Sequence, residues 1–453
     1  MIKPKATVKS TVPTATSRRH RAAKPKDTRA GRLLKELTSF YLDSGDFNGL
    51  LVHQLAERLG QSWREIKPIA AALIKKELIG ILDEKSDVNP AILRVGFEPK
   101  ETQLRKLDDS ILKHTFVYPR LNHLKSVVDP SNYTRRPYLL ELALGHPQFS
   151  FRSFDLSVLE FYRNDPRYTY ENRDIDGLIS IRDEFYKSDQ MEEKDQILLE
   201  SFGFSFDKNL NRAVAVFLRY LARLSPEHQQ IWKTKELTGK YSLHPDYLNY
   251  TIIGDWGQGA SIYVAFCTEM HLLNVMADAM GRAPLFRQTF GPYGENKPTR
   301  FTSLVRPTLE EFNQFALLLD KMTSDNINKD FFQKDVSMET EEQRADGKII
   351  VRPKGTLNIL NKWLRYYFRT SDWQPWDKAF KSLKEVRRLR QQPAHAVDEN
   401  IFDQKYVKDQ RWLVIGAYTA LRTLRLMLAR DPKVKDAHIE IPDWLEKGLI
   451  WTL

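Results

Sequence analysis

The sequence predicts an α+β protein of several domains, and three observations carry this prediction. Apolar residues recur at helical spacing after a basic N-terminus and again through the last third of the chain, whereas the middle alternates short strand-like and helix-like runs. The length of 453 residues is enough for about three domains. We therefore expect a basic tail over 1–29, a helical domain with a β-hairpin over 30–100, a mixed α/β domain over 101–305 and an all-helical domain over 306–453.

The tail concentrates positive charge. Lysines and arginines crowd residues 1–29, where Asp27 is the single acid, and large apolar side chains are scarce. Such a segment cannot bury enough surface to offset its chain entropy, so we expect it to be disordered. Both a basic arm on nucleic acid and a plain solvated tail fit this composition. The whole chain has a formal net charge of +11, which favours a polyanionic partner.

The second segment carries three helical patterns and a hairpin pattern. Helices are expected over 32–42 and 50–59, and a third begins at Trp63, where Ser62 and Glu65 form a capping box. Ile79–Leu82 and Ala91–Val95 have the composition of two paired strands. This order resembles winged helix-turn-helix domains, in which the third helix often enters the DNA major groove.

The resemblance marks candidate phosphate contacts on and just after the third helix. These nucleic-acid-binding candidates are Arg64, Lys67, Lys75 and Lys76. The tip of the expected hairpin, residues 83–87, is acidic and would be repelled by phosphates. DNA binding and docking to another protein therefore both remain open for this domain.

The middle segment predicts strands at Phe149–Phe151 and Ala213–Leu221, and a strand pair over Tyr168–Ile181 that turns at Asp176-Gly177. A long helix is expected over Ser261–Met280, with the single cysteine, Cys267, on its core face.

The last segment predicts a four-helix bundle. A second capping box, Thr308 with Glu311, starts its first helix, and Trp412 is expected on the inner face of its last helix. The polar stretch Thr323–Pro353 is expected to be a loop or insertion. The remaining three helices are predicted at Thr356–Arg369, Trp376–Gln392 and Tyr406–Arg430.

The predicted helix Trp376–Gln392 ends in the residues that are the strongest candidates for catalysis. Arg387, Arg388 and Arg390 crowd its end, and His395 follows. A histidine can move a proton between a ribose 2′-hydroxyl and the leaving oxygen, and an arginine can stabilise charge on the phosphate oxygens. RNA cleavage without a metal or another cofactor requires these two kinds of side chain.

Arg390-Gln-Gln-Pro-Ala-His395 resembles the R-x4–6-H signature of the HEPN superfamily, and its sequence is similar to that of the HEPN domains of prokaryotic defence proteins. The resemblance implies a helical bundle, an endoribonuclease activity and a homodimer whose two motifs face each other across an RNA substrate. It also implies that Arg390 and His395 are catalytic. Active members often have Asn, Asp or His after the arginine, and Gln391 stands in that place here.

The spacing alone is weak, because an arginine-rich chain matches it by chance. Arg223 and His228 form a second match, which we assign to structure because it follows an apolar run and contains a Ser-Pro turn. The chain has no zinc-ligand spacing, no Walker A motif and no G-x-S-x-G elbow.

Three functions remain after these exclusions. The first is a metal-independent endoribonuclease in phage defence or a toxin-like role. The second is a DNA-binding regulator whose helical bundle only dimerises, and the third is a non-catalytic adaptor. No apolar run is long enough for a membrane span, and the single cysteine cannot form an internal disulfide, so we expect a cytoplasmic protein.

Overall fold

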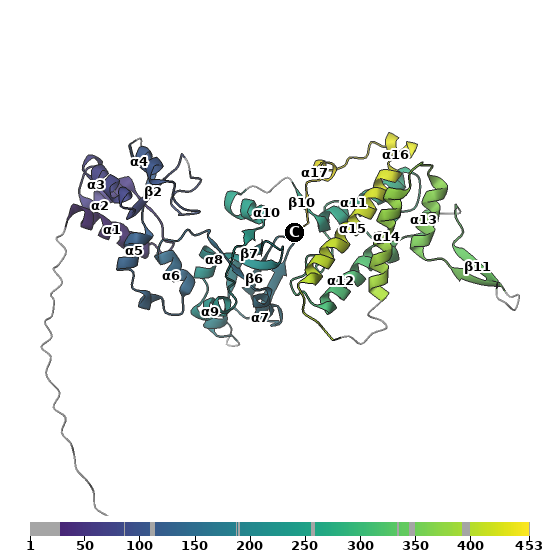
Figure 1. Cartoon of the computed structure of the whole chain (residues 1–453), viewed down its shortest axis with the longest axis horizontal. Coiled ribbons are helices and arrows are strands. Elements are labelled where there is room, and N and C mark those ends of the chain that lie inside the picture. The colour runs from purple at the N-terminus through teal and green to yellow at the C-terminus, as the bar shows by residue number, and fades with distance from the viewer. Residues whose placement is uncertain are drawn as a thin grey trace, which may run out of the picture. The chain divides into compact units, whose positions relative to one another are not determined.

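The computed structural model shows a mixed α/β protein with a helical C-terminal region (Figure 1). It divides into two compact units: the first runs to Val127, except for Arg94–Gly96, which belongs to the second together with the rest of the chain. The basic tail lies almost wholly outside the described residues. These residues are 28–85, 87–108, 114–186, 188, 191–254, 259–332, 335–343, 349–391 and 399–452.

The first unit packs its helices on a small antiparallel sheet of strand order β1-β3-β2. Ser62 and Glu65 form the expected capping box at the start of α3, and Ile66, Ala70 and Leu73 bury one face of that helix. The elements are α1 (Arg29–Asp43), β1 (Leu50–Leu51), α2 (Val52–Leu59), α3 (Trp63–Lys75), β2 (Ile79–Asp83), α4 (Lys100–Asp108), β3 (Thr115–Pro119) and α5 (Leu121–Val127).

The strand that pairs with β2 is not the one that the sequence predicted. Ala91–Val95 forms no strand, and β3 pairs with β2 instead, with Ile81 opposite Val117. Burial explains the difference: β3 buries four of its five residues, whereas Leu93 is the only buried residue of Ala91–Val95. The first unit therefore continues beyond residue 100, where we had placed its end.

The second unit begins with an antiparallel sheet of order β4-β8-β7-β6-β5, and β9 pairs with β7. Its strands are β4 (Phe151–Phe154), β5 (Tyr168–Asn172), β6 (Asp176–Ile181), β7 (Leu198–Phe206), β8 (Arg212–Phe217) and β9 (Ser242–Leu243). The helical turns around it are η1 (Pro130–Tyr133), α6 (Pro137–Ala143), η2 (Leu156–Leu159), α7 (Glu160–Arg163), η3 (Glu193–Asp195), α8 (Leu218–Ala222), α9 (Pro226–Thr234), α10 (Pro245–Leu248) and the π-turn η4 (Asn249–Ile253).

Two expectations for this sheet need correction. The β5–β6 pair forms, but the chain turns at residues 173–175, so Asp176 and Gly177 already belong to β6. The apolar run Ala213–Leu221 is not one strand, because β8 ends at Phe217 and α8 follows directly. All six residues of β8 are buried, which accounts for the apolar composition without a longer strand.

The helical region contains the four helices predicted for it, together with α11 and the short helices α16 and α17 (Figure 1). Its helices are α11 (Ile262–Ala279), α12 (Leu309–Met322), α13 (Thr356–Tyr367), α14 (Gln374–Gln391), α15 (Lys405–Leu428), α16 (Pro432–Asp436) and α17 (Asp443–Glu446). The shorter elements are β10 (Ala260–Ser261) with its parallel partner β13 (Ile450–Trp451), η5 (Ser324–Asn326), η6 (Lys329–Phe332), and the hairpin β11 (Glu339–Gln343) with β12 (Ile349–Pro353).

The long helix α11 belongs to the helical core, although we had placed it in the middle domain. It packs along α15, and most of its circumference is buried, including Cys267. Between the two helices, Glu269 accepts hydrogen bonds from Arg425 at 2.5 and 3.2 Å, and both side chains are buried. One core therefore runs from Ile262 to Leu445, across the boundary that we expected at residue 305.

The described residues of Thr323–Pro353 contain more regular secondary structure than the sequence suggested. They contain η5, η6 and the β11–β12 hairpin, and Phe331 and Phe332 are fully buried.

Within the described part of the chain, none of the helices has the length and apolar character that crossing a membrane requires.

Candidate functional site at the end of helix α14

Helix α14 ends at Gln391, so three of the predicted site arginines lie in its last two turns. His395 falls within residues 392–398, which lie outside the described part of the chain. Gln391 is exposed at the last helical position. The structure therefore describes the arginines that are predicted to bind phosphate, but not His395, which is predicted to transfer the proton.

Arg390 is anchored to carboxylates from the end of α12 and from η5. Its Nη1 donates hydrogen bonds to Asp320 at 2.6 Å and to Asp325 at 2.5 Å. Asp320 is completely buried and also accepts a hydrogen bond from the Ser324 hydroxyl. The hydrogen bond to Asp320, together with the charges of the two carboxylates, raises the pKa of Arg390, so the guanidinium is a permanent cation.

This anchoring leaves part of the guanidinium available. Within the described residues, neither Nε nor Nη2 of Arg390 has a hydrogen-bond partner, and the side chain is one third exposed. Nε and one Nη form the edge with which arginine binds two oxygens of a phosphate. The two carboxylates thus fix the orientation of Arg390 without occupying that edge.

The neighbouring arginines are also paired with carboxylates. Arg387 donates to the Ser324 hydroxyl at 3.1 Å and lies 3.9 Å from Asp325. Arg388 makes two hydrogen bonds, at 2.8 and 2.5 Å, with Glu385 of its own helix. Three arginines face three carboxylates, so the formal charges of these six side chains cancel.

A groove of about 600 Å³ lies between α14 and α15, next to Arg388. Lys381, Ser382 and Glu385 line its α14 side, and Trp412 lines its α15 side. Trp412 is 68% exposed, so its predicted place on the inner face of the last helix is wrong. The neighbouring Leu413 and Val414 are buried in its place, whereas Leu421, Leu424 and Leu428 further along α15 are buried as the helical spacing indicated.

The second R-x4-H match has the geometry of a structural residue. His228 is buried in α9, where its Nδ1 pairs with the Tyr162 hydroxyl at 2.9 Å and its Nε2 with the Asp195 carbonyl at 3.1 Å. Burial lowers the pKa of His228, and Arg223 is paired with Glu200. Ser225 caps α9, so the predicted Ser-Pro turn is the start of a helix.

The candidate nucleic-acid contacts of the first unit lie on and beside α3. Arg64, Lys75 and Lys76 are exposed, and Lys67 is half-buried. The acidic segment that begins at the end of β2 is partly neutralised, because Lys106 forms an ion pair with Asp83 at 3.2 Å.

Elsewhere, the described residues contain no cluster of three or more histidine, cysteine or acidic side chains that could hold a metal ion. Comparison with models of protein families, with curated proteins and with solved structures finds no significant match to this chain.

Proposed function

We propose that the protein is a metal-independent endoribonuclease of the HEPN type, with Arg390 and His395 as its catalytic residues. The observation that carries the proposal is the arrangement of Arg390. Asp320 and Asp325 hold its guanidinium at the end of α14, and the Nε–Nη2 edge is left for a phosphate. The chain then continues over four residues to His395.

The reaction follows from the two side chains. His395 of one copy takes the proton of a ribose 2′-hydroxyl, and the resulting oxygen attacks the adjacent phosphorus. Arg390 stabilises the charge that develops on the phosphate oxygens. The bond to the 5′-oxygen breaks, and a protonated histidine gives that oxygen its proton, so the products are a 2′,3′-cyclic phosphate and a 5′-hydroxyl. Gln391 can donate a further hydrogen bond to the phosphate.

A base and an acid are needed on opposite sides of the phosphorus, and one chain supplies one histidine of this motif. We therefore propose a homodimer through the helical region, in which a second copy supplies the other histidine. The exposed Trp412 beside the α14–α15 groove supports this surface, because large aromatic side chains are enriched at interfaces. We also propose a role in phage defence or as a toxin, because the motif Arg390–His395 resembles that of prokaryotic defence proteins.

The test is incubation of the purified full-length protein with mixed RNA in EDTA, followed by analysis of the RNA ends. His395→Ala is expected to lower the cleavage rate by about 10²–10⁴-fold. His438→Ala is the matched control, because His438 is an exposed histidine outside the motif. Absence of cleavage by the wild type, or equal rates for wild type and His395→Ala, would refute the proposal.

A DNA-binding regulator is the second candidate, and the topology of the first unit favours it. Helix, strand, two helices and two further strands follow one another, with sheet order β1-β3-β2, as in winged helix-turn-helix domains. The helix α4 between β2 and β3 is an addition to that pattern.

The regulator is tested by the salt dependence of duplex-DNA binding. Changing Arg64, Lys75 and Lys76 together to alanine should weaken binding and reduce the salt slope by about one for each phosphate that the variant no longer binds. An unchanged slope would indicate that this surface docks to a protein.

A further inference from the structure

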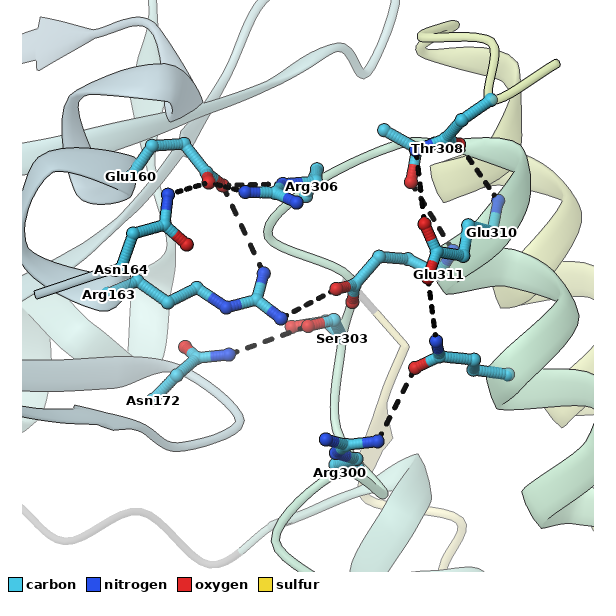
Figure 2. A network of polar contacts seen from close by, with 12 residues as sticks. Glu160, Arg163, Asn164, Asn172, Arg300, Ser303, Arg306, Thr308, Glu310 and Glu311 are labelled. Carbon is cyan, nitrogen blue, oxygen red and sulfur yellow. Dashed lines mark hydrogen bonds and ion pairs between the residues drawn. The ribbon is translucent and has the colours of Figure 1, made fainter. Parts of the chain in front are cut away.

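The second unit contains a cavity of about 680 Å³ where its sheet meets the helical region. Strand β5 and helix α7 supply one side, and α12 with the segment before it supplies the other (Figure 2). Binding sites for small molecules usually have volumes of roughly 300–1,000 Å³, so the size alone admits a metabolite.

Three of the residues that line the cavity have a buried polar atom that lacks a partner among the described residues. The Tyr170 hydroxyl, the Asn172 Oδ1 and the Ser303 hydroxyl are all buried, and none has a hydrogen-bond partner among the described residues. All three residues line the cavity. An unpaired buried polar group costs about 1–3 kcal/mol, so three among the residues that line one cavity require an explanation. A ligand that bonds to them supplies one.

The charges of the cavity are also unbalanced. Figure 2 shows Arg163 reaching across to Glu311, which it contacts at 2.6 Å, while Arg306 is paired with Glu160 at 3.0 Å. These four charges cancel. Arg300 and Lys321 also line the cavity and are exposed, and neither has a carboxylate within ion-pair distance among the described residues. Among the described residues these two cations therefore have no carboxylate partner, although Arg300 also donates a hydrogen bond to the Gln314 side-chain oxygen at 3.4 Å.

The remaining lining is mainly apolar and includes Phe315, Leu304 and Leu318. The Tyr170 ring is stacked on Phe202, with ring centroids 6.1 Å apart, so its hydroxyl is held in place. The cavity thus combines an apolar body, buried hydrogen-bonding groups and a cationic opening. A ligand that fits all three has a flat or apolar body, polar groups on its buried edge and an anionic group at its exposed end.

We propose that this cavity binds a small phosphate-bearing compound of the size of a nucleoside monophosphate. The buried edge of its ring hydrogen-bonds to Tyr170, Asn172 and Ser303, and its phosphate lies between Arg300 and Lys321. Neither Arg390 nor Gln391 lines this cavity, so the proposal does not depend on RNA cleavage.

The test is isothermal titration of the full-length protein with the four common nucleoside 5′-monophosphates, the four nucleosides and inorganic phosphate. At least one monophosphate should bind more tightly than its nucleoside and than phosphate. Arg300→Gln and Lys321→Gln should each weaken that binding about tenfold, which corresponds to the removal of one charged hydrogen bond. Lys435→Gln, an exposed lysine on α16, is the control and should not change it.

Tyr170→Phe separates a ligand site from a merely structural defect. It removes an unpaired hydroxyl, so the melting temperature without ligand should stay the same or rise, while affinity for the monophosphate falls about tenfold. Tyr138→Phe is the matched control: its hydroxyl donates to Glu236 at 2.9 Å, so that variant should lose stability and keep its affinity. Binding of no monophosphate by the wild type, or full affinity in Tyr170→Phe, would overturn the proposal.

Discussion

The buried histidine His244 should make the second unit sensitive to acid. His244 is 3% exposed, and its Nδ1 accepts a hydrogen bond from the backbone N–H of Asp246 at the start of α10. Burial, and secondarily the nearby cation Arg212, lowers the pKa of His244 from 6.5 to about 4. Arg212 is itself buried beneath the ring of Phe204, so a proton on His244 would place two cations in the core.

The direction and size of the effect follow from these two pKa values. Above pH 6.5 the imidazole is neutral in both the folded and the unfolded chain, so its contribution does not vary with pH. As the pH falls from 6.5 to about 4, the unfolded chain binds a proton that the folded chain does not. The free energy of unfolding should then fall by about 1.36 kcal/mol for each pH unit, or about 3 kcal/mol in all.

The measurement is urea unfolding of the wild type and of His244→Asn at several pH values between about 4.5 and 7.5. Asparagine keeps an oxygen acceptor at the helix start and does not titrate. The variant should be less stable at neutral pH, because it no longer packs on the Trp451 ring, but its stability should depend less on pH.

The control is His438→Asn, at an exposed position with φ of 46° that asparagine tolerates. It should retain the full pH dependence of the wild type. Parallel pH profiles for the wild type and His244→Asn would refute the reasoning.

Three further predictions follow from the packing. Glu269→Ala leaves Arg425 buried without its partner and should lower the free energy of unfolding, measured in urea, by about 3–5 kcal/mol. Changing both residues to methionine should recover much of that loss, and a loss below about 1 kcal/mol in the single variant would contradict this. Gly203→Ala should lower the free energy of unfolding by about 1–3 kcal/mol, because the new Cβ would lie 2.2 Å from the Tyr247 ring. An unchanged melting temperature would show that the ring moves aside freely. Trp412→Arg should convert the proposed dimer to a monomer in light scattering while circular dichroism stays unchanged, and an unaltered mass would place the dimer surface elsewhere.

The sequence predicted helices well where a cap and a buried stripe agreed. Thr308 caps α12, and its hydroxyl accepts from the Glu311 N–H at 3.3 Å, but the predicted capping box is incomplete, because the Glu311 carboxylate pairs with Arg163 instead. Local signals were enough there, because both the cap and the stripe depend on residues within a few positions.

Strand pairing and domain boundaries could not be predicted in the same way, because they depend on distant residues. The partner of β2 lies more than thirty residues further along, at β3, and a hairpin pattern close to β2 offered a wrong alternative. The helical core extends across the expected boundary at residue 305, because α11 packs along α15, which lies over a hundred residues later in the chain. The orphan polar atoms of Tyr170 and Ser303 likewise come together only in the folded chain, and no local spacing marks them.

The environment of Arg390 gives this residue a structural role beside the proposed catalytic one. Asp320 has no exposed surface, and a buried carboxylate without a cation is strongly destabilising, so Arg390 supports the fold whether or not RNA is cut. Loss of activity in Arg390→Ala would therefore not identify a catalytic role. The double variant Asp320→Asn with Arg390→Ala removes the buried charge together with its partner, and the amide oxygen introduced at position 320 can still accept the hydrogen bond from the Ser324 hydroxyl. If this folded double variant lacks the RNA cleavage that Asp320→Asn alone retains, the guanidinium itself acts on the phosphate; if both variants cleave equally, Arg390 is structural and the catalytic argument rests on His395 alone.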